Sequence, residues 1–126
     1  MAKPTYQDAM LLLQIIQWGA AIGMGEAAGW IWSDHFIPDY AEFVKKYPRG
    51  SEEYLHASTI CAYWETLGTF HKHGLLNDEL LFDWAGVSYT WGRVKGYVLG
   101  KRQEEGQPRL YENFEALAEA NVAYYA

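Results

Sequence analysis

The sequence has a single cysteine, Cys61, among its 126 residues. One cysteine allows no disulfide within the chain, so a hydrophobic core must stabilise the fold, and a reducing compartment, the cytoplasm, is expected. Half of the residues are apolar, and a chain of this length can bury a sufficient core without disulfides. We therefore expect residues 1–126 to form one domain, with Cys61 as a small buried hydrophobic residue.

Basic residues are also scarce. The chain has 10 Lys and Arg against 16 Asp and Glu, a formal net charge of −6 at pH 7. Proteins that bind nucleic acid rely on basic patches, whereas the local group of cations in residues 93–102 is followed directly by acidic residues. We therefore expect no nucleic-acid partner.

No apolar run is long enough to predict a membrane-spanning helix. The longest uncharged stretch, residues 9–25, has 17 residues and includes Gln14, Gln17 and three glycines. A spanning helix needs about 20 apolar residues, and no basic flank is present to set an orientation. The stretch instead predicts a buried helix, and no membrane partner is expected.

Motifs of common catalytic and metal sites are missing as well. The sequence contains no G-x-S-x-G, no H-E-x-x-H and no phosphate-binding loop, and it does not carry the two E-x-x-H motifs of di-iron bundles. His71 and His73 are two positions apart, so on a helix they diverge by about 160° and cannot easily share an ion. We expect no metal and no cofactor, and a non-catalytic role is favoured over an enzyme.

What is present is helical spacing of apolar residues, with no alternating pattern that would predict a strand. Thr5 with Asp8, Ser51 before two glutamates, and Asn77 before two acidic residues are typical of helix starts. Helices are expected at residues 6–32, 39–46, 51–73, 77–103 and from Pro108 onward. The first is either continuous or kinked at its glycines, which are residues 19, 23, 25 and 29. A connection of about three residues predicts an antiparallel hairpin at 51–104. The predicted fold is all-α, a compact bundle of four to five helices.

The first predicted helix is apolar on two nearly opposite faces. One face carries Ala9, Leu13, Ile16, Ala20, Ala27 and Ile31, and the other carries Leu11, Ile15, Trp18 and Ile22. A helix that is apolar nearly all round lies either at the centre of its bundle or between two molecules. We expect a homodimer whose interface is formed by Leu11, Ile15, Trp18 and Ile22.

Three glycines, Gly92, Gly96 and Gly100, recur at every fourth position of the fourth predicted helix. Each costs about 1 kcal/mol of helix stability relative to alanine, so a compensating contact is expected. Glycine allows another backbone to approach closely, and the neighbour would be the third helix or the Gly19/Gly23 region of the first. The alternatives are a groove that admits a ligand and positions that are merely exposed.

A ligand site is the second possibility that the sequence offers. Lys95 and Arg102 fall on the same face of the fourth helix as its core residues, and cations on such a face need partners. They can extend to solvent or pair with Glu52, Glu53 or Glu112. Alternatively they form a site for an anionic or aromatic small molecule, lined by Trp64, Trp84, Trp91, Lys95 and Arg102.

The second half of the chain carries a recurrent set of residues. It has an aromatic-Glu-x-Leu-Gly segment, a Gly-Leu-Leu turn, a Trp-bearing helix, an Arg, and a closing Tyr-x-x-Phe-x-x-Leu. The matching residues are Trp64, Glu65, Leu67, Gly68, Gly74, Leu75, Trp91, Arg102, Tyr111, Phe114 and Leu117. In this pattern residues 60–118 resemble a bacterial family of uncharacterised helical domains, a domain of unknown function. The resemblance implies a helical fold and gives no activity.

Two functions therefore remain open at the level of sequence. The first is a non-catalytic interaction or assembly module that acts as a homo-oligomer. The second is a helical bundle that binds a small molecule. A filled core with apolar contact between chains would favour assembly, and an enclosed cavity with converging polar groups would favour ligand binding.

Overall fold

The computed structural model describes residues 2–126, and within them seven α-helices and no strand are found. The helices are α1 (Tyr6–Ala21), α2 (Met24–Ile31), α3 (Tyr40–Lys46), α4 (Glu52–Lys72), α5 (Asp78–Trp84), α6 (Val87–Glu105) and α7 (Glu112–Tyr124). The all-α class is as predicted, but the expected number of four to five helices is wrong.

Two predicted helices are each divided in two. The first breaks at Gly23, whose φ of 82° lies in the left-handed region that glycine adopts without a steric penalty. The fourth breaks at Ala85 and Gly86, where Ala85 has the extended angles φ −127° and ψ 128°. Helical spacing of apolar residues continues through both breaks, so it does not place them. The glycines of the first predicted helix left a break open there, and Gly23 is where it occurs.

Three predicted helix starts are present, whereas the last helix begins at Glu112 and not at Pro108. Thr5 and Asp8 form a reciprocal capping box on α1. Ser51 accepts a hydrogen bond from the backbone of Tyr54 at the start of α4, and Asn77 does the same for Leu80 at the start of α5.

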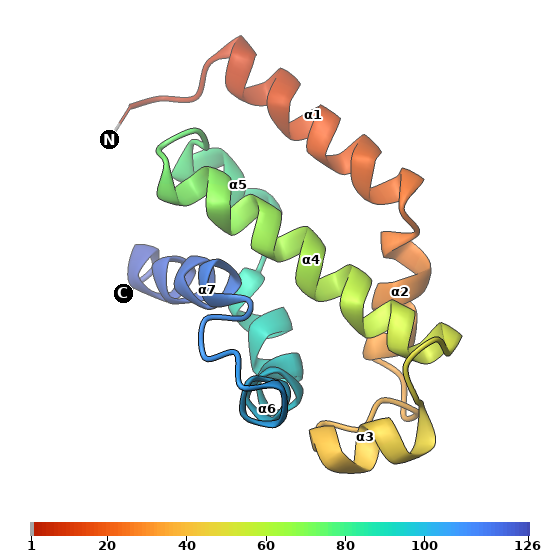
Figure 1. The fold of residues 1–126 in the computed structure, drawn as a ribbon. Coiled ribbons are helices and arrows are strands. Elements are labelled where there is room, and N and C mark those ends of the chain that lie inside the picture. The colour runs from red at the N-terminus through yellow and green to blue at the C-terminus, as the bar shows by residue number, and fades with distance from the viewer. Residues whose placement is uncertain (1) are drawn as a thin grey trace.

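Helix α4 crosses the middle of the molecule, with α1 and α2 on one side and α6 and α7 on the other (Figure 1). Its main neighbours are α7 and α2, and α6 packs chiefly on α7 and α3. The predicted antiparallel hairpin at 51–104 is therefore wrong. The extended Ala85 separates α5 from α6, and α7 rather than α6 is the main partner of α4.

The core is drawn unevenly from the helices. Ile31, Phe43, Leu67, Tyr97 and Phe114 are fully buried and come from α2, α3, α4, α6 and α7. Helix α1 buries only Ile15 and Gly19 of its 16 residues. None of the helices in residues 2–126 is long and apolar enough to cross a membrane.

Candidate functional site

The junction between α4 and α7 is built around a partly buried carboxylate. Glu65 Oε1 accepts hydrogen bonds from the backbone N–H groups of Asn113 and Phe114, both at 2.9 Å. Its Oε2 accepts a third from Asn113 Nδ2 at 2.8 Å. Because the first N–H groups of a helix lack partners within the helix, and because the N-terminus favours negative charge, Glu65 acts as a cap for α7 supplied by another helix.

Neighbouring residues close the same junction. A Cβ at Gly68 would lie 2.2 Å from the backbone oxygen of Asn113, so only glycine allows this approach. Arg102 donates from Nε to the Leu110 carbonyl at 2.7 Å and forms an ion pair with Glu115 at 2.9 Å. Tyr111, at φ 58°, precedes α7. The family-like pattern of the sequence therefore describes the docking of α7 on α4 and α6, which is a structural role.

The five residues predicted to bind a ligand do not surround a common space. Trp64 packs on Trp84, with ring centres 5.9 Å apart, whereas Trp91 packs on Phe114. Lys95 is exposed, and Arg102 is held at the α7 junction with its guanidinium 5.8 Å from the Trp91 ring centre. Five hollows on the surface formed by residues 2–126 are lined by other residues.

The three α6 glycines differ from one another. A Cβ at Gly100 would lie 2.6 Å from Tyr40 Cβ, and a Cβ at Gly96 would lie 3.2 Å from the Pro38 carbonyl oxygen. Nothing lies within 4 Å at Gly92. Residues 38–40, which lead into α3, cross α6 at Gly96 and Gly100, where glycine leaves room for the approach. The close neighbour of α6 is thus this segment, rather than α4 or α1.

The residues predicted to form a dimer interface face the interior of their own chain to different degrees. Ile15 is buried, and Leu11 is partly buried against the core. Trp18 stacks on Tyr63 with ring centres 5.1 Å apart and keeps 38% of its surface exposed, and Ile22 is equally exposed. An interface through this set would therefore rest on Trp18 and Ile22.

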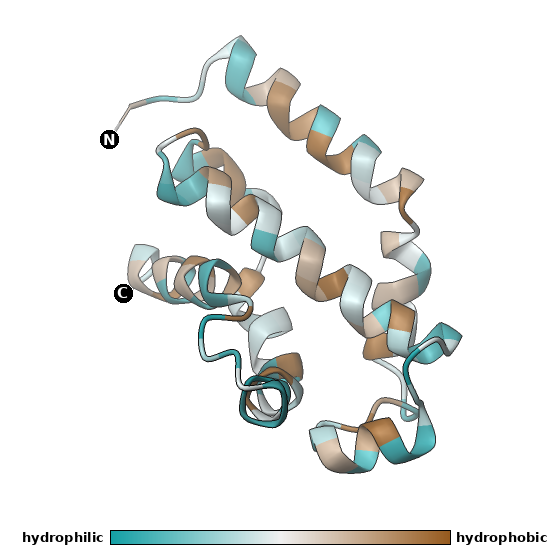
Figure 2. Ribbon diagram, in the orientation of Figure 1, coloured by the Kyte–Doolittle hydropathy of each residue, from teal (hydrophilic) through white to brown (hydrophobic). Residues whose placement is uncertain are grey.

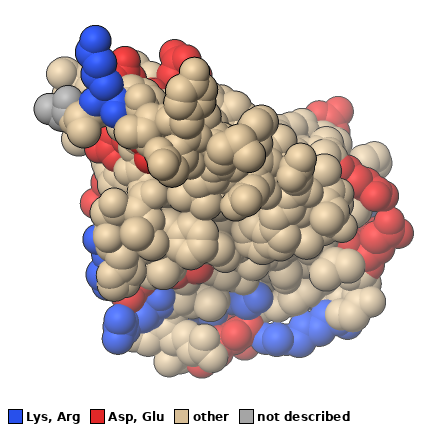
Figure 3. Space-filling view, turned by 90° about the horizontal axis from the view of Figure 1, so that it is seen from above, with Lys and Arg blue, Asp and Glu red and all other residues tan. Residues whose placement is uncertain are grey.

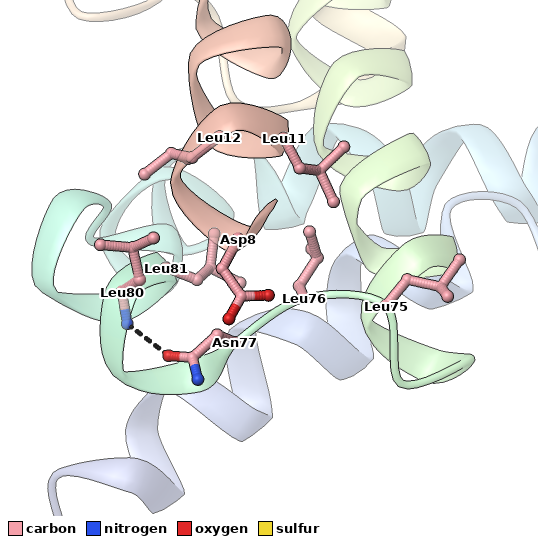
Figure 4. A pocket seen from close by; sticks show the side chains of 8 residues that line it. All are labelled: Asp8, Leu11, Leu12, Leu75, Leu76, Asn77, Leu80 and Leu81. Carbon is pink, nitrogen blue, oxygen red and sulfur yellow. Dashed lines mark hydrogen bonds between the residues drawn. The ribbon is translucent and has the colours of Figure 1, made fainter. Parts of the chain in front are cut away.

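Helix α1 is seated on the body by leucines. Leu11 and Leu12 face Leu76, Leu80 and Leu81 across a cavity of about 10 Å³, next to the Asn77 cap (Figure 4). A space of this size is comparable to one water molecule. The leucine contact between α1 and α5 thus attaches α1, and the cavity within it is too small to serve as a ligand pocket.

The outward face of α1 carries exposed apolar side chains. Tyr6 is 91% exposed and Leu13 53% exposed, and Met10 and Ile16 are exposed beside them. No charged residue occurs between residues 9 and 25. Viewed from the α1 side, the centre of the molecule is free of charged side chains, which gather toward the margins (Figure 3), and α1 itself is largely apolar (Figure 2).

A tyrosine cluster surrounds the buried Lys101. The Lys101 Nζ lies 4.8 Å from the centre of the Tyr54 ring, 5.9 Å from that of Tyr97 and 6.0 Å from that of Tyr111, so ring faces stabilise its charge. Burial raises the pKa of Tyr97 and Tyr111 well above the ordinary value, and raises the pKa of the Cys61 thiol to about 12. These groups stay protonated near neutral pH, which does not suit them to proton transfer or nucleophilic attack.

Comparison with known protein families gives a match over most of the chain. Residues 4–120 match the protein family described as domain of unknown function DUF4760. No curated protein and no solved structure matches the chain.

Proposed function

The chain belongs to the DUF4760 family, and we propose that it is a non-catalytic assembly module that pairs with a second copy of itself through the outward face of α1. The observation that carries the proposal is the exposure of this face: α1 buries two of its 16 residues. A reducing, cytoplasmic setting fits its single, buried cysteine.

The spacing of the exposed residues favours another helix as the partner. Five of the exposed α1 residues are spaced at intervals of four and three, and the average of 3.5 is the spacing that two packed helices share along a coiled-coil seam. The positions are Tyr6, Met10, Leu13, Gln17 and Ala20. This stripe, which we call the α1 seam, runs the length of the helix.

The charge distribution favours a second copy of the chain as the partner of α1. The chain carries a net charge of −6, so two copies repel one another over most orientations. The α1 seam lacks charge, so pairing there brings no like charges into direct contact. A two-fold pair also uses the same patch on both copies, which closes the assembly at a dimer.

The test compares two exposed leucines. Leu13→Glu places a charge in the α1 seam, whereas Leu55→Glu places the same charge on α4, where the leucine is 62% exposed. Light scattering after size exclusion, at micromolar concentration, should show a dimer for the wild type and for Leu55→Glu and a monomer for Leu13→Glu. A monomeric wild type would contradict the proposal.

Small-molecule binding is a second candidate, because one hollow has a suitable size and lining. An open hollow of about 520 Å³ is lined by Phe82, Tyr89 and Tyr125 and by the buried Asn121. Ligand pockets commonly span about 300–1,000 Å³ and combine aromatic walls with a few polar groups. Chemical-shift mapping with small aromatic amides would support this candidate if Asn121 shifts, and would count against it if no shift clusters there.

A further inference from the structure

Two glutamates and a histidine, far apart in sequence, meet where α2 crosses α4. Glu26 lies on α2, and Glu52 and His56 lie one turn apart on α4. One donor atom from each, a carboxylate oxygen or an imidazole nitrogen, lies within 4.8 Å of the other two. Although the sequence motifs led us to expect no metal, the geometry points to a binding site for a divalent transition-metal cation, such as Zn²⁺, that clamps α2 to α4.

The donor distances suit such an ion. Zinc binds nitrogen and carboxylate oxygen at about 2.0–2.2 Å in a tetrahedral arrangement, so neighbouring donor atoms stand roughly 3.4 Å apart. His56 Nε2 and Glu52 Oε1 are 3.8 Å apart. Because Glu26 and Glu52 are exposed, side-chain rotation alone can close the remaining gap. Three protein ligands leave a fourth position for water.

The imidazole is oriented before any ion binds. The His56 side chain is only 14% exposed and lies against the Trp30 ring, with ring centres 5.9 Å apart. Its 3.8 Å approach to Glu52 is too long for a hydrogen bond. The ring is therefore held by packing, with Nε2 free to bind a cation.

The negative charge of the two glutamates also favours binding of a cation. The Glu26 and Glu52 carboxylates converge, and no lysine or arginine forms an ion pair with either of them within residues 2–126. Two carboxylates with an imidazole favour zinc, nickel or cobalt over magnesium and calcium, which prefer oxygen donors alone.

This proposal is independent of pairing through α1, and thermal unfolding of the metal-free full chain without a histidine tag tests it. Zn²⁺ at 100 times its Kd should raise the Tm by about 10 °C, and equal Mg²⁺ should not. Glu26→Gln and His56→Ala should each abolish the rise. His73→Ala, which removes an exposed histidine at the other end of α4, should retain it.

Three results would overturn the proposal: no Zn²⁺ effect on the wild type, an effect kept in full by either Glu26→Gln or His56→Ala, or an effect lost in His73→Ala. If His56→Ala does not fold, the exposed pair Glu26→Gln and Glu52→Gln decides by the same criteria. Calorimetric titration should show one Zn²⁺ per chain, and more than one of equal affinity would also count against a single built site.

Discussion

Helices α1 and α7 both lie against α4, yet they are attached in different ways. Helix α7 is fixed by a charged cap from Glu65, by the backbone approach that Gly68 allows, and by the Arg102–Glu115 ion pair. Helix α1 is held by leucine packing and by one hydrogen bond from Tyr63 to the Ile15 carbonyl at 2.9 Å. Specific polar contacts therefore fix α7 to α4 and α6, whereas α1, which is more weakly attached, presents the free surface.

The largest effect is expected from removing the α7 cap. Glu65→Ala leaves the N–H groups of Asn113 and Phe114 without their acceptor, and it should lower the free energy of unfolding by about 3 kcal/mol. Urea denaturation would measure the loss. Glu119→Ala, an exposed glutamate on α7 itself, should change it by less than about 0.5 kcal/mol. Equal losses in the two variants would show that the cap is unimportant.

Replacing glycine by alanine should lower the free energy of unfolding at one site and raise it at another. Gly68→Ala forces a methyl group against the Asn113 carbonyl and should destabilise the fold by about 2–3 kcal/mol. Gly92→Ala meets nothing within 4 Å and should stabilise it by about 0.5–1 kcal/mol, since alanine favours helix. Stabilisation by Gly68→Ala, measured in the same urea series, would refute the close α4–α7 approach.

A smaller and local effect is expected at α1. Tyr63→Phe removes the hydrogen bond to Ile15 and should cost about 1 kcal/mol. Amide hydrogen exchange should become faster along α1 while α7 keeps its protection, because α1 can unfold locally while the other helices stay folded. Equal acceleration in both helices would contradict the difference in attachment.

The sequence predicts local structure better than contacts. The caps at Thr5, Ser51 and Asn77 could be read directly, because each depends on residues within one turn. The breaks at Gly23 and Ala85 could not, because the apolar spacing continues through them and only the tertiary environment decides whether a glycine bends the chain.

The candidate sites show the same limit. The aromatic-Glu-x-Leu-Gly segment can be identified in the sequence. The role of Glu65 cannot, because it depends on a contact with Asn113, which lies 48 residues further along the chain. Glu52 and His56 at i and i+4 were a readable signal, whereas Glu26 joins them only through the crossing of α2 and α4. Which apolar face of α1 turns outward was likewise set by α5 and Tyr63, so Leu13 is exposed and Ile15 is not.

The most direct test of the central claim is the distance between spin labels on two copies. Leu13→Cys can be labelled selectively, because Cys61 is fully buried and burial raises its thiol pKa to about 12. Helices packed along a seam lie about 8–10 Å apart, so pulsed electron spin resonance should find labels at residue 13 within roughly 20 Å of each other. Leu55→Cys labels should be farther apart. A missing short distance at residue 13, or one found at residue 55 instead, would contradict pairing through α1.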